Sequence, residues 1–154
     1  MKITDIKIDV IRREIPDTGL DSDVGRFERT AEQGLLRIHT GEGIEGNCYI
    51  GAFRGGGHSH FGPILNVLKP ELLGREASDR EWLWNRLPIL NSRRGITIQN
   101  WSPVDVALWD ITGKAAELPI YKLLGTQRYH TEVYGTYPPR YESPEGTWKK
   151  HAKW

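Results

Sequence analysis

The apolar residues of this chain are spaced in two different ways, and the change comes at a glycine-rich stretch, residues 51–57. Before that stretch they recur at every second position, which is typical of strands with one buried face. After it they recur at every third or fourth position, which is typical of amphipathic helices. The pattern therefore predicts a run of strands followed by a run of helices, and hence an α+β fold.

Three strands are predicted in the first part of the chain. The first spans Lys2–Glu14, where Ile6 and Ile8 alternate with charged residues, and two more span Gly34–Thr40 and Ile44–Ile50. Only Gly-Glu-Gly separates the last two strands, so they form an antiparallel hairpin. Together the segments predict a three-stranded antiparallel sheet.

A helical bundle is predicted in the second part. The apolar residues of Phe61–Leu72 share one helical face, and Ser78–Glu81 is a capping box that opens a second helix. A third helix starts at Ser102–Pro103, because serine caps a helix end and proline suits the first turn. This helix ends before Pro119, and Ile120–Gly125 form a last short turn.

The composition excludes several classes of protein. The 21 Lys and Arg against 20 Asp and Glu leave a net charge of +1, which provides no basic surface for nucleic acid or an anionic membrane. The apolar runs are far shorter than the roughly 18 residues of a membrane span, and the N-terminus lacks the apolar stretch of a signal peptide. The single cysteine, Cys48, excludes an intrachain disulfide. We therefore expect a soluble, cytoplasmic protein with no nucleic-acid or membrane partner.

Two glycine motifs resemble phosphate-binding loops but lack the residues that such loops need. Gly41-x-Gly43-x-x-Gly46 matches the dinucleotide fingerprint, yet a predicted strand follows where a helix is required. The spacing from Gly57 to Gly62 begins like a P-loop, but Pro and Ile replace the residues that reach phosphate and magnesium. The motifs therefore do not predict nucleotide binding.

Three side chains near the glycine-rich stretch are candidates for contacting an anionic substrate: Arg54, His58 and His60. The two histidines are two positions apart, which suits a strand or loop rather than one helix face. Two histidines without a third ligand make a poor metal site, so no metal ligand is predicted. With Arg54 they offer cationic and hydrogen-bonding groups to a carboxylate. The alternative is that they are solvated loop residues.

The remaining reactive side chains have simpler interpretations. Asp105, Asp110 and Glu117 lie on one predicted helix, where capping, pairing with Lys114 and solvent exposure account for them. Cys48 lies in a predicted strand, which favours a packed and inert thiol. No catalytic residue is therefore predicted in this chain.

The segment Ser102–Gly125 strongly resembles the signature that ends the N-terminal domain in the mandelate racemase / muconate lactonizing enzyme family of the enolase superfamily. The matching positions are Asp105, Ala107, Leu108, Asp110, Gly113, Lys114, Pro119, Leu123, Leu124 and Gly125. The resemblance implies that residues 1–125 form a capping domain, a three-stranded antiparallel sheet with a helical bundle, that covers a (β/α)7β barrel. It implies further that residues 126–154 begin the barrel, with Thr131–Tyr137 as the first strand.

The resemblance also implies a division of labour. In the family, carboxylates of the barrel bind Mg²⁺, and a lysine or histidine removes the proton α to a substrate carboxylate. Two loops of the first domain, here Asp17–Glu32 and Gly51–His60, close over the barrel and select the substrate. The implied substrate is a small carboxylate or sugar acid, and the implied activity that of a dehydratase or racemase.

After Gly125 the chain continues for 29 residues, which carry no counterpart of the family's metal ligands or bases. We therefore expect the chain alone to be catalytically incomplete and to bind no Mg²⁺, as a truncated or split member or the N-terminal piece of a longer chain. Two alternatives stay open: a complete small binding module for an anionic ligand, and a protein that docks on a full-length paralogue. A homo-oligomer is compatible with each.

Overall fold

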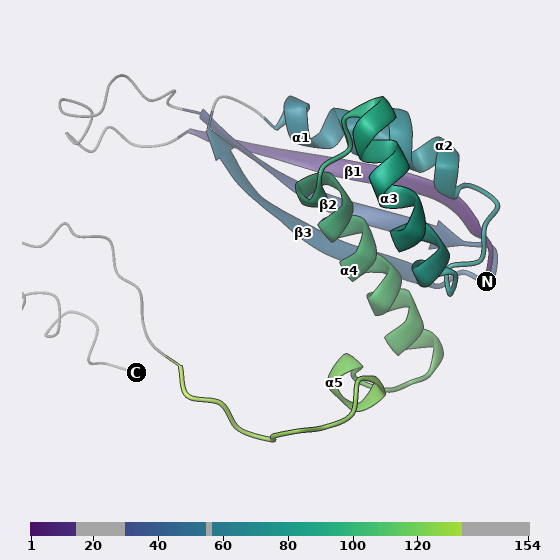
Figure 1. Ribbon diagram of the computed structural model, residues 1–154. Helices are drawn as coiled ribbons and strands as arrows, with labels where there is room; N and C mark the ends of the chain where they lie inside the picture. Colours follow the sequence, from purple (N-terminus) through teal and green to yellow (C-terminus); the bar gives the residue numbers. More distant parts are fainter. Residues whose placement is uncertain (15–29, 55–56, 134–154) are drawn as a thin grey trace, which may run out of the picture.

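The computed structural model describes residues 1–14, 30–54 and 57–133, and the side chains of all these residues except 52–54. It has an α+β architecture. Three antiparallel strands form one sheet in the order β1-β2-β3, and helices cover one face of this sheet (Figure 1). The predicted fold class, a three-stranded antiparallel sheet followed by helices, is confirmed.

Two of the three strands are longer than the sequence predicted. The strands are β1 (Ile3–Glu14), β2 (Thr30–Thr40) and β3 (Glu45–Arg54). β2 and β3 pair as far as Ala31 opposite Arg54. This pairing gives hydrogen-bond partners to backbone N–H and C=O groups of residues that lie outside the alternating apolar pattern of the sequence. Residues 30–32 and 51–54, which the sequence places in the two loops, are therefore strand.

Residues 58–72 form a continuous helical segment with a change of pitch. Its parts are α1 (His58–Pro63), the π-helical η2 (Ile64–Leu68) and α2 (Lys69–Leu72). The expectation that His58 and His60 lie on a strand or loop is wrong. The helix starts at Gly57, whose carbonyl accepts hydrogen bonds from the N–H groups of His60 and Phe61 at 2.9 and 2.8 Å. The apolar period starts only with Phe61, the first buried residue of α1, and so places the start too late.

The two long helices also begin at residues other than those predicted. They are α3 (Arg80–Arg94) and α4 (Ile98–Ala115). Asp79 precedes α3 without a side-chain cap, so the capping box expected at Ser78–Glu81 is not formed. α4 starts ahead of Ser102–Pro103, because Asn100 Oδ1 accepts hydrogen bonds from the N–H and the hydroxyl of Thr97 at 3.0 and 2.9 Å. The predicted start of this helix is therefore wrong.

The sequence predicted the C-terminal end of the helical part more closely. α4 ends at Ala115, and α5 (Ile120–Leu123) follows Pro119. After Leu124, Gly125 has a φ of 86°, a left-handed conformation that favours glycine. Residues 126–133 then form neither helix nor strand (Figure 1).

The expected first barrel strand, Thr131–Tyr137, is described only in part. Thr131, Glu132 and Val133 are not in a strand, and Val133 is 88% exposed. Residues 134–137 lie outside the described part of the chain. The division into a capping domain at 1–125 and a barrel start at 126–154 therefore stays a prediction.

The hydrophobic core lies between the sheet and the helices, with α4 crossing the covered face of the sheet (Figure 1). The largest fully buried side chains come from all of these elements: Trp101, Ile3, Ile6, Leu36, Ile38, Ile64, Leu68, Leu72, Leu83, Ile96, Leu108 and Ile111. Among the described residues, no helix is long and apolar enough to cross a membrane. This core fixes the positions of β3, α1 and α4, the three elements that line the candidate site described below.

Candidate functional site

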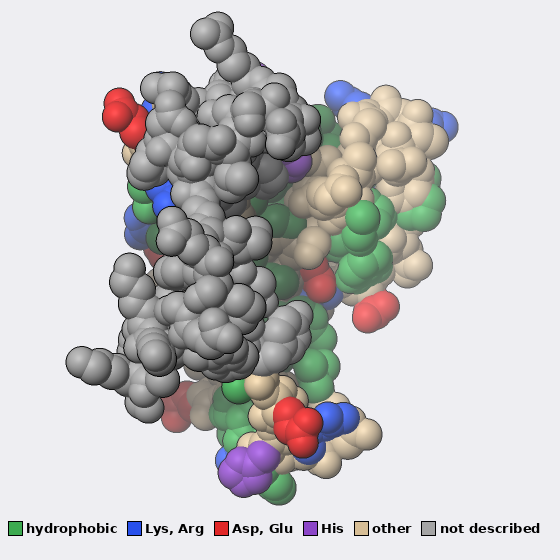
Figure 2. Space-filling view, turned by 90° about the vertical axis from the view of Figure 1, so that its left-hand side faces the viewer, with side chains coloured by type: hydrophobic (Ala, Val, Ile, Leu, Met, Phe, Trp, Pro, Cys, Tyr) green, Lys and Arg blue, Asp and Glu red, His purple; other side chains and the backbone are tan. Residues whose placement is uncertain are grey.

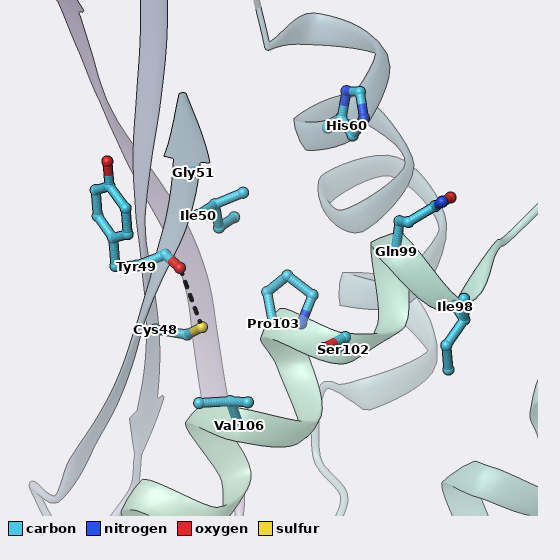
Figure 3. Close-up of a pocket in the computed structure, with 10 residues that line it drawn as sticks. All are labelled: Cys48, Tyr49, Ile50, Gly51, His60, Ile98, Gln99, Ser102, Pro103 and Val106. Carbon is cyan, nitrogen blue, oxygen red and sulfur yellow. Dashed lines mark hydrogen bonds between the residues drawn. The ribbon is translucent and has the colours of Figure 1, made fainter. Parts of the chain in front are cut away.

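A pocket of about 580 Å³ lies between β3 and the first half of α4, with α1 at one end (Figure 3). Its lining residues are Cys48, Tyr49, Ile50, Gly51, His60, Ile98, Gln99, Ser102, Pro103 and Val106. A bulge shapes the strand side, because Ile50 is opposite Gly34 whereas Phe53 is opposite Glu32, so two residues of β3 face one of β2. Bulges of this kind bend a strand and often lie beside functional sites.

The pocket is lined mainly by apolar side chains, with a few polar ones among them. In Figure 3, Cys48 and Ile50 point from β3 toward Pro103 and Val106 of α4, while the ring of Tyr49 points to the other side of the strand. Polar groups come from His60, Gln99 and Ser102. Such a mixture suits a small ligand with an apolar side and several hydrogen-bonding groups.

The surface around the pocket carries exposed apolar side chains. Ile98 is 51% exposed and Val106 is 46% exposed. Figure 2 shows hydrophobic side chains at the surface of the described part of the molecule, with acidic and basic side chains scattered among them. The face shown in Figure 2 therefore carries scattered charged side chains rather than one large patch of a single charge.

Cys48 contributes shape to the pocket rather than reactivity. Burial, together with the charge of Asp110, raises the pKa of the Cys48 thiol, so it stays protonated at neutral pH. The Cys48 thiol donates a hydrogen bond to the carbonyl oxygen of Tyr49, with the sulfur 3.5 Å from that oxygen. A packed and inert thiol, as the sequence suggested, fits these contacts.

The three predicted substrate contacts occupy different places. His60 lies half-buried at the pocket, and its Nδ1 is 3.1 Å from the hydroxyl of Ser59. His58 is exposed on the same short helix, and two positions apart on a helix they point in different directions. Arg54 ends β3, and its side chain lies outside the described part of the structure. Of the two histidines, the structure brings His60 to the pocket, and the binding role of all three residues stays a prediction.

Glu32 is the charged group that sequence reasoning missed. The sequence places Glu32 in a loop, but it lies in β2, and its side chain is 11% exposed. Its Oε1 accepts a hydrogen bond from Arg12 Nε at 2.9 Å, and its Oε2 accepts one from the N–H of Gly57 at 2.7 Å. These contacts hold the pKa of Glu32 below its usual range, with the Gly57 bond the largest cause and Arg12 next. No local sequence pattern indicates them, because the partners come from two other segments.

The acidic residues of α4 have structural partners. Asp110 Oδ2 accepts hydrogen bonds from Lys114 Nζ at 2.6 Å and from the N–H of Asn47 at 2.8 Å. Asp105 Oδ1 accepts one from Trp84 Nε1 at 3.2 Å. Within residues 1–14, 30–54 and 57–133, no three His, Cys, Asp or Glu side chains are grouped so as to hold a metal ion. The described residues therefore do not fit a magnesium site.

Comparison with protein families identifies the origin of this arrangement. The sequence pattern described as "Mandelate racemase / muconate lactonizing enzyme, N-terminal domain" matches residues 26–125. The chain belongs to this family. The match confirms the resemblance carried by Ser102–Gly125, and the order of sheet and helices agrees with the N-terminal domain of the enolase superfamily.

Individual members of the family are much longer than the matched segment. Arabinonate dehydratase from Saccharolobus solfataricus is 45% identical over 76 residues, which are 47% of this chain and 20% of that protein. A solved member of the enolase superfamily from Polaromonas sp. JS666 matches with a TM-score of 0.72 and 26% identity, over 99% of this chain and 40% of that one. A racemase from Streptomyces coelicolor A3(2), solved with bound magnesium, matches with a TM-score of 0.66 and 28% identity, over 80% of this chain and 35% of that one.

The homologues are thus acid-sugar dehydratases and racemases of the enolase superfamily. This chain covers their N-terminal domain and spans a fifth to a quarter of the length of the first curated relatives. The mandelate racemase / muconate lactonizing enzyme family therefore accounts for the fold, and the signature residues Asp110, Gly113 and Lys114 belong to the contact between α4, β3 and the turn after α4.

Proposed function

We propose that this chain supplies the substrate-covering domain of a Mg²⁺-dependent dehydratase or racemase that removes the proton α to the carboxylate of a sugar acid. The observation that carries the proposal is the match of residues 26–125 to the N-terminal domain of this family, with arabinonate dehydratase among the relatives. Because the described residues do not fit a magnesium site, the ion and the catalytic base belong to a barrel in this proposal. The domain itself contributes substrate recognition.

The recognition role rests on the pocket between β3 and α4. His60, Gln99 and Ser102 place an imidazole, an amide and a hydroxyl among the lining residues of a partly apolar pocket. A sugar acid carries several hydroxyl groups and a carboxylate, which such groups recognise by hydrogen bonding. Arg54 and His58, which flank the segment before α1, add cationic groups for the carboxylate or a distal hydroxyl.

The test joins residues 1–125 of this chain to the barrel of the Saccharolobus arabinonate dehydratase, in place of that enzyme's own N-terminal domain. We expect the fusion protein to show Mg²⁺-dependent loss of water from at least one aldonate or aldarate, measured by formation of the 2-keto-3-deoxy product. We expect the 154-residue chain alone to show no turnover. A folded fusion protein that binds Mg²⁺ but is inactive on the whole panel would contradict the proposal, as would turnover by the chain alone.

Substitution of the pocket histidine tests the recognition role separately. In the fusion protein, His60→Ala should raise KM about tenfold and change kcat little, because it removes a contact made in both the ground and transition states. His39→Ala is the matched control, since His39 pairs with Glu45 at 3.1 Å, away from the pocket. Equal KM values for His60→Ala and the unaltered fusion protein would remove His60 from the site.

The pocket also supports a second candidate, a small anion-binding module that works without a barrel. This function predicts that the 154-residue chain binds aldonates directly, with an affinity that His60→Ala weakens. Isothermal titration calorimetry with gluconate and arabinonate distinguishes the two functions. Micromolar binding by the chain alone favours the module, and the absence of heat together with an active fusion protein favours the covering domain.

A further inference from the structure

Glu32 connects three segments that are distant in the sequence. Its carboxylate lies at the start of β2, Arg12 lies near the end of β1, and Gly57 directly precedes α1. Oε1 accepts hydrogen bonds from Nε and Nη2 of Arg12, and Oε2 accepts one from the N–H of Gly57. The carboxylate is nearly buried, with 11% of the side chain exposed. Each oxygen therefore holds a different element.

The bond to Gly57 acts on the first turn of α1. The N–H groups at the start of a helix have no partner within the helix, so they need one from outside. Glu32 supplies this partner at 2.7 Å, and the carbonyl of Gly57 accepts the first hydrogen bonds of α1 from His60 and Phe61. One peptide group therefore joins the Glu32 carboxylate to the turn that carries both histidines.

Packing at the same point restricts α1 further. A Cβ on Gly57 would lie 2.2 Å from the ring of Phe61, and a Cβ on Gly34 would lie 2.9 Å from the same ring. Phe61 is buried, and its ring lies between the two glycines. The ring packs α1 against the sheet, and apolar contact of this kind has no preferred direction. The charged hydrogen bond from Glu32 supplies that direction.

The charges around Glu32 keep it ionised. The hydrogen bond from Gly57 and the guanidinium of Arg12 from β1 hold the pKa of Glu32 below its usual range, and His58 from α1 adds a smaller effect in the same direction. A neutral amide of the same shape lacks the charge, and its NH2 group cannot accept from an N–H. Glutamine is therefore a sensitive test of this position.

We propose that Glu32 is a positioning residue, which sets where α1 stands relative to the sheet and thereby where His60 meets a ligand at the pocket. The proposal rests on the proposed function only in the statement that His60 meets substrate. The placement of α1 by Glu32 is a property of the chain itself, so it is tested without any activity. Failure of the recognition role and failure of the placement are therefore distinguishable.

The first experiment measures amide hydrogen exchange by NMR in the full 154-residue chain. In Glu32→Gln, exchange at Gly57, His60 and Phe61 should accelerate about tenfold or more, while Leu36 in the middle of β2 is unchanged. The result expected is thus a local opening of α1. Uniform acceleration, or none, would overturn the proposal.

Glu45→Gln is the matched control. Glu45 is also a partly buried carboxylate on the sheet, and it accepts two hydrogen bonds from Arg37 at 2.9 and 2.8 Å. The substitution therefore removes the same charge and a pair of hydrogen bonds to an arginine, at a site away from α1. It should leave the exchange of α1 unchanged. Equal effects of Glu45→Gln and Glu32→Gln on α1 would show a general loss of stability and would overturn the proposal.

A second readout follows the histidine rings themselves. The ¹H–¹³C signals of His58 and His60 should shift in Glu32→Gln and stay in place in Glu45→Gln, which a loss of stability alone does not produce. If Glu32→Gln does not fold, a pH titration of the unaltered chain still tests the proposal. The amide proton of Gly57 should then follow a carboxyl titration below the usual range of glutamate. A chemical shift of the Gly57 amide proton that does not change over this titration would overturn the proposal.

Discussion

Gly46 is the residue on which the contact between β3 and α4 depends. A Cβ at this position would lie 2.1 Å from the carbonyl oxygen of Ala107 and 2.6 Å from Ile111 Cγ1. A backbone oxygen in the middle of a helix cannot move aside, so only glycine lets the helix lie directly on the strand. The next turn of α4 then brings Asp110 and Lys114 to the same strand.

Gly46→Ala should therefore lower the free energy of unfolding by about 2–3 kcal/mol, because the helix must move away from the sheet. Urea unfolding followed by circular dichroism measures the change. Gly41→Ala is the control, since a Cβ there meets its nearest atoms at 3.8 and 4.0 Å, and its effect should stay within about 0.5 kcal/mol. Equal effects of the two substitutions would contradict the close contact.

Asp110 provides a second test at the scale of the residue. Its Oδ2 accepts hydrogen bonds from Lys114 Nζ and from the N–H of Asn47 at 2.6 and 2.8 Å. Asp110→Asn should cost about 1–2 kcal/mol of unfolding free energy, because the backbone N–H loses a charged acceptor. Asp9→Asn is the control, as Asp9 is 55% exposed and pairs with Arg37 at 3.3 Å, and it should change stability very little. A larger loss in Asp9→Asn would refute the assignment.

Among the elements, α4 shows how a helix start is chosen by its capping contacts rather than by its most favourable sequence. Ser102-Pro103 is a good N-terminus by composition, yet both residues lie inside α4. The cap formed by Thr97 and Asn100 starts the helix earlier, and Asn100 is buried there. The interior position of Pro103 forfeits one backbone hydrogen bond, a cost that the tertiary packing of α4 offsets.

Alanine substitutions at the two positions distinguish the starts. Asn100→Ala should cost about 1–2 kcal/mol, since it removes the acceptor of the Thr97 N–H. Ser102→Ala should stay within about 0.5 kcal/mol, because Ser102 is exposed. Thermal or urea unfolding of the two variants measures both. The opposite ranking would mean that the helix begins at Ser102 in solution.

On the scale of the whole molecule, buried and half-buried carboxylates join different segments of the chain. The pKa of each is held below its usual range by a partner: Asp5 by Lys69, Glu32 by Gly57 and Arg12, Glu45 by Arg37, and Glu76 by the N-terminal amine. Asp5 links β1 to α2, with Lys69 Nζ 2.6 Å from its Oδ1. The folded state therefore prefers these groups ionised more strongly than the unfolded chain does.

This preference predicts how stability depends on pH. Because the folded pKa values are depressed, the stabilisation is complete above the unfolded values near 4 and is lost as the pH falls through the folded values. The urea midpoint should therefore be constant between pH 7 and about 5.5 and fall steadily below that. Glu45→Gln should make the fall shallower, since one of these groups is absent. A midpoint at pH 3 equal to that at pH 7 would contradict the prediction.

The sequence alone determined the class of the fold, the order of sheet and helices, and the family. These properties follow from signals that are local in the chain: the spacing of Ile6, Ile8 and Val10 in a strand, the glycines of the hairpin turn, and the continuous signature of α4 and α5. Such signals can be read from the sequence because they depend on residues that are only a few positions apart. The signature Asp105–Gly125 identified the family for the same reason.

The tertiary structure decided the lengths of β2 and β3, the start of α4, the helical position of His58 and His60, and the partners of Glu32. Each depends on atoms that are distant in the sequence: Glu32 meets Gly57 across 25 positions, and Asp110 meets Asn47 across 63. Hydropathy and capping patterns carry no information about contacts between residues that are this far apart in the sequence. A buried carboxylate on a strand and a glutamate in a solvated loop therefore look the same in the sequence, and only the folded chain, which supplies or withholds the donors, separates them.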